Sequence, residues 1–186
     1  MNRDKYSGDY RLRDNVVNGR LVQTAEYIGE YYRFRILSER RRPIAARLLA
    51  FCIVGILACI LPVSITNHLS AVLYAVIPHL LTAIPLWLLI ASLMRIRFGK
   101  EPIIHEHADK TVKYFAIGAP SAVLTAGLAV LGDMVWMVSH FSDNTSGGDL
   151  IFLICDIIIL LAGIYCLLNR GISEVAVTRD SSSDAL

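Results

Sequence analysis

The sequence predicts an all-α membrane protein, a bundle of four transmembrane helices preceded by a small β-meander. Hydrophobic residues make up 55% of the 186 residues, and mean hydropathy is +0.53, which is more apolar than an ordinary soluble domain. The apolar residues also gather in four runs, each long enough to cross the hydrocarbon core of a bilayer as a helix. The lipid bilayer is therefore the first partner that the sequence predicts.

The distribution of the 18 Lys and Arg residues predicts how the bundle is oriented. They occur only in the first 47 residues, in the segment 95–113 and after the fourth apolar run, whereas the connections 66–69 and 140–149 contain none. Basic residues accumulate in the cytoplasmic loops of membrane proteins. The pattern predicts a multi-pass plasma-membrane protein whose two termini and middle loop are all cytoplasmic (N-in, C-in).

The N-terminal segment is predicted to contain β-strands. Residues 10–17 and 20–28 suit two strands, because Asn18 and Gly19 between them fit a type I′ turn, which needs positive φ at both central positions. Residues 31–36 alternate apolar and polar side chains and favour a third strand. We expect a meander of two or three strands. It is too small to be stable alone, so it should pack on the bundle, the lipid surface or a protein partner.

Four arginines, Arg40, Arg41, Arg42 and Arg47, lie where the first apolar run meets the cytoplasm. Such clusters attract anionic lipid headgroups at about 1 kcal/mol per charge. The simpler interpretation is that the arginines only fix the topology of the chain, and the sequence favours it over recognition of a particular lipid.

The boundaries of the predicted helices follow from the apolar runs and the residues that flank them. The first helix is expected to begin at Pro43, since proline suits the first turn of a helix. The second is expected to kink at Pro78 and Pro85, because each proline removes one backbone hydrogen bond. The segment 178–186 is rich in serine and is expected to be disordered. The predicted helices are 44–65, 70–94, 114–139 and 150–168, which gives a β module (1–43), a transmembrane domain (44–168) and a cytoplasmic tail (169–186).

The segment 95–113 is expected to be a solvated cytoplasmic loop. It contains His105, Glu106, His107 and Asp109, residue types that bind metal ions. Short His-x-His patterns are common in loops, and nothing else in the sequence supports a site. No metal site is therefore predicted.

Three ionisable residues fall inside the predicted spans: His79, Asp133 and Asp156. Asp133 comes six residues before the end of the third helix, and Asp156 comes six residues after the start of the fourth. At about 1.5 Å rise per residue, both carboxyl groups lie about 9 Å inside the same membrane face. Each of the three shares its helix face with small residues, so all three can point into one interior.

A charge at that depth costs about 2.5 kcal/mol or more, so each acid needs a partner, a proton or water. Two carboxylates that lie close together in a low-dielectric interior share a proton or bind a cation, unless His79 acts as counter-ion. The cluster therefore has two interpretations. It is either a proton- or cation-binding site, or a set of interhelical hydrogen bonds worth about 0.6 kcal/mol each that holds the bundle together.

Several function classes lack support in the sequence. It contains no Gly-x-Ser-x-Gly, no His-Glu-x-x-His, no Gly-rich phosphate loop and no Cys-x-x-Cys, so neither an enzyme nor a cofactor is predicted. The four cysteines all lie in apolar runs, where they serve as small packing residues. Topology already explains the basic residues, so no nucleic-acid partner is predicted.

The predicted function is that of a non-enzymatic accessory or interaction subunit of a membrane complex. Its exposed strand residues would bind a protein partner or another copy of the chain, while the bundle holds the His79, Asp133 and Asp156 cluster. The alternative is a small proton- or cation-coupled transporter or channel that acts as an oligomer and uses this cluster as its site.

Overall fold

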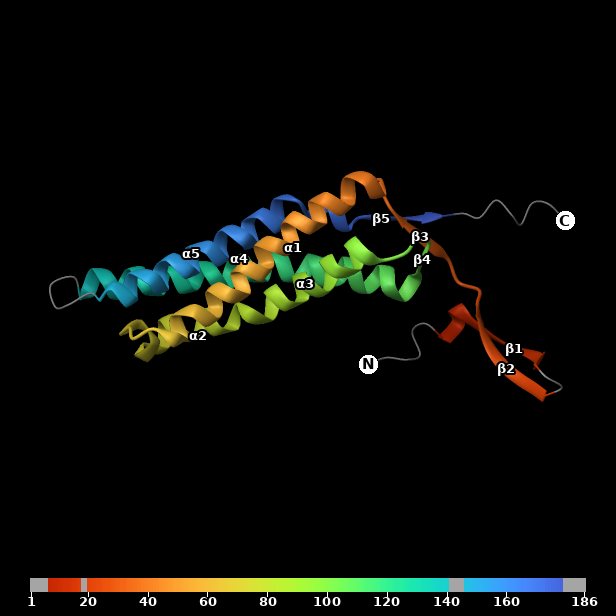
Figure 1. The fold of residues 1–186 in the computed structure, drawn as a ribbon, viewed down its shortest axis with the longest axis horizontal. Helices are drawn as coiled ribbons and strands as arrows, with labels where there is room; N and C mark the ends of the chain where they lie inside the picture. The colour runs from red at the N-terminus through yellow and green to blue at the C-terminus, as the bar shows by residue number, and fades with distance from the viewer. Residues whose placement is uncertain (1–6, 18–19, 141–145, 179–186) are drawn as a thin grey trace.

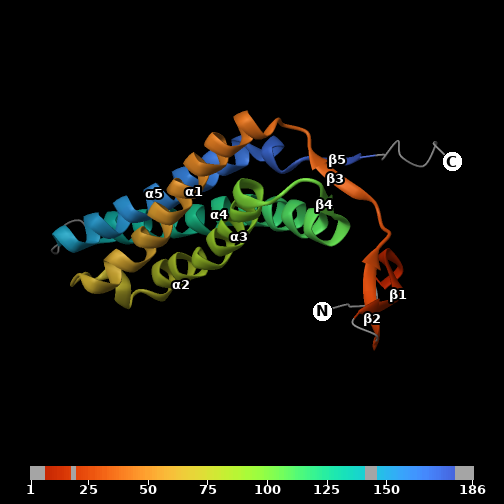
Figure 2. The same ribbon diagram turned by 45° about the vertical axis from the view of Figure 1, so that its right-hand side comes forward.

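The computed structural model describes residues 7–17, 20–140 and 146–178, and it is mostly helical with two small sheets (Figure 1). Within these residues, four helical segments are long and apolar enough to cross a membrane, which confirms the predicted membrane-spanning helices. They lie side by side as an elongated bundle, and the strands gather at one end of it (Figures 1 and 2). The segments are Ser38–Ser64, Leu73–Phe98, His105–Ser139 and Gly147–Leu168.

The first span is α1 (Ser38–Ile60) followed by a 3₁₀ turn, Leu61–Ser64. The prediction that Pro43 begins this helix is wrong, because Pro43 lies inside the first turns of α1. Its missing N–H would have bonded the carbonyl of Glu39, and a helix tolerates the loss of one bond so close to its end. At the other end, Pro62 lacks the N–H that would continue the α-helical pattern, and the chain tightens into the 3₁₀ turn there.

The second span is interrupted at Thr82, which divides it into α2 (Leu73–Leu81) and α3 (Ala83–Phe98). Pro85, three residues later, has no N–H to donate to the preceding turn. The N–H of Thr82 is divided between two carbonyl groups of that turn, at 3.1 and 3.2 Å. The irregularity lies between the two prolines of this span, in the middle of the bundle. α2 begins later than predicted, because a separate 3₁₀ turn, Leu69–Ala71, precedes it.

The third span is α4 (His105–Ser139), which begins nine residues before the predicted start at residue 114. The prediction that the segment 95–113 is a solvated loop is therefore wrong for its second half. Glu106 and Lys110 form an ion pair one turn apart, which supports a helix there. The buried residues of these first turns also recur at helical spacing.

The fourth span, α5 (Gly147–Leu168), begins three residues before its predicted start at Leu150, with a capping box. The Ser146 hydroxyl oxygen accepts the backbone N–H of Asp149 at 3.3 Å, and the Asp149 carboxylate accepts the backbone N–H of Ser146 at 2.9 Å. The two bonds satisfy backbone donors that a helix leaves unpaired at its start. The prediction followed the apolar run and missed this polar first turn.

α4 occupies the central position in the packing of the bundle, since it contacts α2, α3 and α5. α1 contacts α3 and α5 on the other side. α4 comes closest to α2 at Gly132, where a Cβ atom would lie 2.9 Å from the carbonyl oxygen of Tyr74. The absence of a side chain at this position brings the next residue, Asp133, close to the neighbouring helices.

The N-terminal hairpin forms as predicted. β1 (Tyr10–Val17) and β2 (Arg20–Tyr27) pair antiparallel along their whole length, while residues 18–19, the predicted turn, lie outside the described part of the chain. The hairpin contacts the start of α4 through Tyr27, whose hydroxyl oxygen accepts the backbone N–H of His105 at 2.9 Å. Burial raises the pKa of Tyr27, so this phenol stays protonated.

β3 (Tyr31–Phe34) does not extend the hairpin, so the prediction of a third strand in the meander is wrong. It lies between β4 (Ile103–Ile104) and β5 (Val175–Thr178) in a separate sheet and is antiparallel to both. Strands of two and four residues carry too few side chains for an alternating pattern to reveal their partners. The predicted tail therefore contributes a strand, while residues 179–186, expected to be disordered, lie outside the described residues.

Arg41 joins this sheet to the bundle. Its side chain is 1% exposed, its guanidinium lies 4.2 Å from the centre of the Phe34 ring, and it forms an ion pair with Glu101. A guanidinium can stack on an aromatic ring while its N–H groups bind a carboxylate. Because Arg41 is buried, the contact with lipid headgroups that the sequence left open does not apply to it. The other three arginines of the cluster are exposed: Arg40, Arg42 and Arg47.

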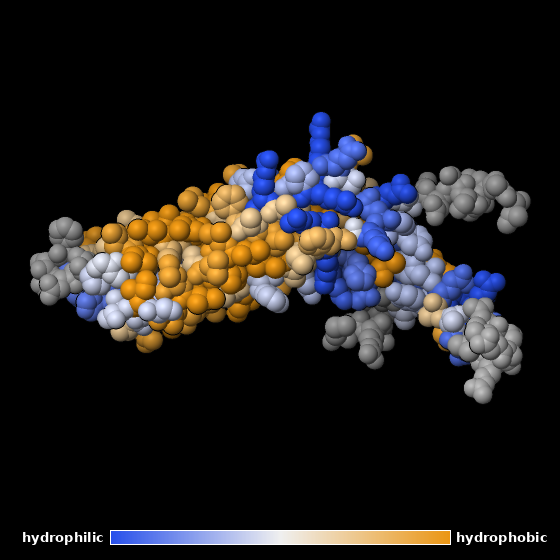
Figure 3. Space-filling view, viewed as in Figure 1, coloured by the Kyte–Doolittle hydropathy of each residue, from blue (hydrophilic) through white to orange (hydrophobic). Residues whose placement is uncertain are grey.

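The surface of the protein is divided by polarity. Figure 3 shows hydrophobic residues over the middle of the bundle and hydrophilic residues gathered at the end that carries the sheet. Large apolar side chains such as Phe51, Leu57 and Trp87 are exposed on the spans. An exposed apolar belt of this extent needs lipid or another protein to cover it, so the structure is that of a membrane protein.

Arg41→Ala is expected to lower the free energy of unfolding by roughly 3 kcal/mol, because it removes a buried ion pair and the stacking on Phe34. Thermal unfolding in detergent micelles, followed by circular dichroism, measures the effect. Arg40→Ala removes the exposed arginine one position earlier and should leave the unfolding midpoint almost unchanged. Equal midpoints for the two variants would contradict the role assigned to Arg41.

Candidate functional site

The three ionisable residues predicted to lie inside the spans come together in the bundle. His79 on α2, Asp133 on α4 and Asp156 on α5 are each completely buried. α1 completes the site with a backbone group, the carbonyl of Cys59. All four spans therefore contribute to one polar cluster, which we define as His79, Asp133, Asp156 and the Cys59 carbonyl.

His79 is held from both sides of its ring. Its Nδ1 lies 2.6 Å from Asp156 Oδ1, and its Nε2 lies 3.0 Å from the carbonyl oxygen of Cys59. A carbonyl oxygen only accepts, so Nε2 must carry a hydrogen and donate it. The Cys59 carbonyl is available because it belongs to the last turn of α1, where helical carbonyls lack an intrahelical donor.

The position of one proton decides the charge of the His79–Asp156 pair. With Nε2 protonated, Nδ1 either donates to an Asp156 carboxylate, as an imidazolium, or accepts from a protonated Asp156, as a neutral ring. In both cases a single proton lies between Nδ1 and Oδ1, and the pair has no net charge. The 2.6 Å separation suits a charge-assisted hydrogen bond of this kind.

Asp133 lacks such a partner. No donor among the described residues reaches either of its carboxyl oxygens, and none reaches Oδ2 of Asp156. The two carboxyl groups are nevertheless close enough that a proton on one would be donated to the other. Two bare carboxylates in contact repel each other strongly in a dry interior, so a proton between them is the arrangement that the geometry favours.

Thr82, at the break between α2 and α3, connects the cluster to the irregular part of the backbone. Its hydroxyl donates to the carbonyl oxygen of His79 at 2.5 Å, and it accepts from the Cys59 thiol, whose sulfur lies 3.2 Å away. Thr82 is completely buried. The His79 backbone is thus fixed to the point where the second span can bend.

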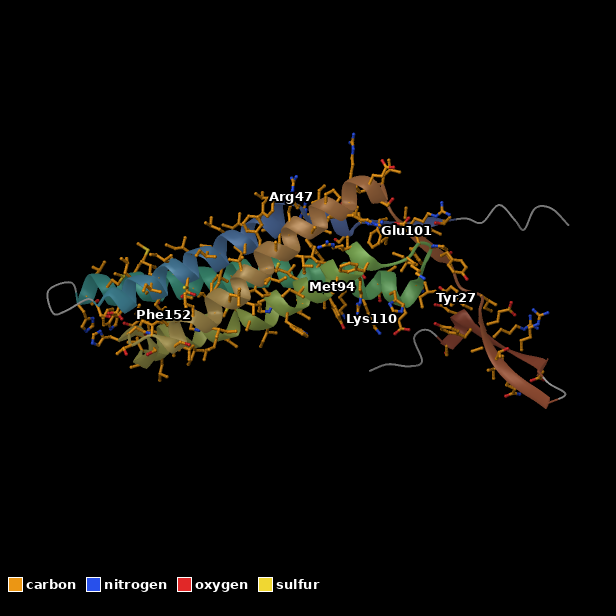
Figure 4. The ribbon with its side chains drawn as sticks, viewed as in Figure 1. Tyr27, Arg47, Met94, Glu101, Lys110 and Phe152 are labelled. Carbon is orange, nitrogen blue, oxygen red and sulfur yellow. The ribbon has the colours of Figure 1, made fainter. Side chains whose placement is uncertain are left out.

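An apolar plug separates the cluster from one end of the bundle. Ala75, Trp136 and Phe152 each lie about one helical turn beyond a cluster residue on the same helix, and together with Leu69 they form a buried apolar group, defined here as the plug. Phe152 also packs on the His79 ring, with ring centres 4.6 Å apart. Figure 4 shows Phe152 toward the end of the bundle that is remote from Tyr27 and Glu101; we call this the distal end.

Asp149 connects the start of α5 to residues 68–69 at the distal end, next to the plug. Besides capping α5, its carboxylate accepts the backbone N–H groups of His68 and Leu69, at 2.7 and 3.2 Å, and lies 3.1 Å from His68 Nδ1. The rings of His68 and His140 both stack on the ring of Trp136, with ring centres 5.9 and 4.9 Å from it. Sequence reasoning missed Asp149, although Ser146 three residues earlier is the signal of a capping box.

The residues weighed as metal ligands have other roles. His105 Nδ1 lies 3.2 Å from Asp9 Oδ2 and its ring stacks on Tyr32, while Glu106 pairs with Lys110. Among the described residues, no group of three His, Cys, Asp or Glu side chains is arranged to hold a metal ion. His105 thus holds the N-terminal segment against the start of α4, while the Glu106–Lys110 pair lies within the helix.

Comparison with known proteins adds no assignment: the chain matches no family model, no curated protein and no solved structure.

The two aspartates are expected to respond differently to replacement by leucine. Asp156→Leu leaves His79 Nδ1 buried without a partner and should lower the free energy of unfolding by about 1–3 kcal/mol. Asp133→Leu removes only the proton shared with Asp156 and leaves the His79–Asp156 bond in place, so it should lower the free energy of unfolding by less than Asp156→Leu does. Thermal unfolding of both variants in the same detergent measures the difference. A larger loss for Asp133→Leu than for Asp156→Leu would mean that Asp133 holds the bundle together.

Proposed function

We propose that this protein is a non-enzymatic plasma-membrane protein that binds and releases protons inside its bundle, as a small proton-coupled transporter. The observation that supports this function best is the buried Asp133, which has no donor of its own and lies against Asp156, itself bonded to His79. A side chain that only held helices together would have a hydrogen-bond partner. Ionisable residues inside spans that do not stabilise them mark ion and proton pathways.

The chemistry of the cluster suits a proton better than a metal cation. Asp156 Oδ1 is engaged by His79, so the described residues leave only both oxygens of Asp133 and Oδ2 of Asp156 without a donor. Hard cations such as Ca²⁺ take about six to eight oxygen ligands. A proton needs only one oxygen on each side, and the cluster supplies that arrangement.

The order of the groups suggests how a proton would move. A proton that reaches Asp133 can pass to Asp156, and the proton between Asp156 and His79 can shift toward the ring. His79 lies three residues before the break at Thr82. A bend at Thr82 would move the imidazole away from Asp156 and toward a different side of the bundle. The charge of the cluster would thus be coupled to the angle between α2 and α3.

A second candidate, the accessory subunit, is favoured by the N-terminal hairpin. β1 and β2 extend away from the bundle (Figures 1 and 2), and an isolated pair of strands is only marginally stable in water. Leu12 and Tyr10 are exposed on it. A protein partner, or another copy of this chain, that packs on the hairpin would explain both features. The two functions are compatible, because a proton-binding subunit can act within a complex.

The proposal places both termini and the β4 segment on the cytoplasmic side, and the distal end outside. Single-cysteine variants test this topology, because all four native cysteines are buried. Ser64→Cys should react with a membrane-impermeant maleimide on intact cells, whereas Lys100→Cys should react only after the membrane is permeabilised. The opposite result would reverse the orientation and put the cluster near the cytoplasm.

Infrared absorption of the protein in lipid nanodiscs tests proton binding directly. We expect a carboxylic-acid C=O band that changes with pH in the wild-type protein and is lost in Asp133→Asn. Asp149→Asn is the matched control, since Asp149 is equally buried but its carboxylate accepts several donors and needs no proton. A band that Asp133→Asn leaves unchanged would refute the proposal.

Proton flux into proteoliposomes separates the two candidate functions. A membrane potential should drive proton uptake into wild-type vesicles but not into vesicles with Asp133→Asn. If the wild-type protein shows the infrared band but neither wild-type nor Asp133→Asn vesicles take up protons, the cluster binds protons in an accessory subunit and the transporter is excluded.

A further inference from the structure

We propose that a cavity at the charged end of the bundle binds a phosphate-bearing anionic ligand. The cavity has a volume of about 370 Å³ and lies between the end of α3, β4 and the first turns of α4. Small-molecule sites typically have volumes of about 300–1,000 Å³, with apolar walls and a few polar groups that orient the ligand. This proposal is independent of the polar cluster, which lies in the opposite half of the spans.

The walls of the cavity combine cationic and apolar side chains. Arg95 and Lys100 supply positive charge, and His107 supplies a ring N–H that can donate a hydrogen bond. Phe34, Ile103 and Ile104 supply apolar surface from β3 and β4. A ligand that carries both an anionic and an apolar part would fit this lining better than a simple inorganic ion.

Arg95 provides the most specific observation. Its Nη1 atom is buried and has no hydrogen-bond partner among the described residues, while its guanidinium lies 5.2 Å from the centre of the Tyr114 ring. A buried guanidinium N–H without an acceptor is costly. The nearby acid Glu106 is paired with Lys110. Arg95 lines the cavity, so a rotation of its side chain would bring Nη1 to an anionic oxygen there and supply the missing acceptor. Arginine binds phosphate through two parallel N–H groups.

The backbone at this place also favours an anion. α4 begins next to the cavity. The first N–H of the helix, that of His105, is accepted by the Tyr27 hydroxyl, whereas the N-cap residue, Ile104, has no side-chain oxygen to accept the N–H groups that follow. The N-terminus of a helix carries a partial positive charge that stabilises phosphate and other anions. The helix end and the three side chains therefore act in the same direction.

The position of the cavity suggests two sources for the phosphate. Arg95 follows directly on the apolar part of the second span, at the level where lipid headgroups lie, so an anionic phospholipid can reach it from the membrane. A soluble phosphate compound can reach it from the aqueous side. In both cases the ligand would contact Phe34 and Ile103, and so would hold β3 and β4 together.

Two titrations distinguish these sources. The protein is placed in nanodiscs of phosphatidylcholine with increasing phosphatidylglycerol, and bound lipid is counted by native mass spectrometry after release. In a parallel series, inorganic phosphate is added to phosphatidylcholine nanodiscs, and its binding is followed by the broadening of its phosphorus NMR signal. Arg95→Gln and Lys100→Gln are compared with Lys113→Gln and Arg170→Gln, which replace exposed residues outside the cavity and change the net charge equally.

Arg95→Gln should weaken binding by about tenfold or more, the loss that corresponds to one charged hydrogen bond, and the two controls should bind like the wild type. This pattern with phosphatidylglycerol identifies a lipid headgroup site, and the same pattern with phosphate alone identifies a site for a soluble ligand. If Arg95→Gln fails to fold, Lys100→Gln carries the comparison, because Lys100 is exposed and lies outside the helices. No saturable binding, or equal weakening in the controls, would overturn the proposal.

Discussion

The cost of removing carboxyl groups from water governs the structure of the spans. Asp133 and Asp156 are completely buried between apolar helices, and a charged group there must be bonded or protonated. The bundle meets this constraint with backbone irregularities as well as side chains. The end of α1 offers a carbonyl to His79, and the break at Thr82 fixes the histidine in place. Among the described residues a partner reaches one oxygen of Asp156 and neither oxygen of Asp133, and that difference separates a site from a structural contact.

The charged end of the molecule meets the same constraint in a different way. Arg41 is as well buried as the aspartates, but it has an aromatic ring on one side and Glu101 on the other. The arrangement connects β3 and the start of α1, which are neighbours in the sequence, to the distant segment before β4 at one guanidinium. Arg95, one layer deeper toward the membrane, has a ring but lacks an acceptor for Nη1. Arg41 Nε is also buried without a partner, so the two arginines differ in that Arg95 lines the cavity whereas Arg41 does not.

Sequence reasoning was most successful where the physical signal is local and repeated. The four apolar runs gave the spans, and Asn18 and Gly19 gave the hairpin strands, because hydropathy and turn chemistry act over a few neighbouring residues. Helical rise predicted equal depths for Asp133 and Asp156, and this stays a prediction, since α5 begins three residues earlier than the helix start on which it rested. The helix ends were harder to predict. α4 begins in a polar segment and α1 begins before a proline, because both helices extend beyond the apolar runs from which they were predicted. The pairing of β3 with β5, and the bond from His79 to a backbone carbonyl, depend on contacts between distant segments, which hydropathy cannot reveal.

The length of α4 has a mechanical consequence. Its 35 residues span about 52 Å at 1.5 Å per residue, well beyond the roughly 30 Å thickness of a hydrocarbon core. The part of the helix near His105 therefore extends beyond the core as an arm, which is connected through Pro120 to the turn that carries Asp133. A small tilt produced deep in the membrane is magnified at its far tip, where the His105 amide binds Tyr27 of the hairpin. Protonation of Asp133 would in this way displace the hairpin at Tyr27. No series of side-chain rearrangements between the two places is needed.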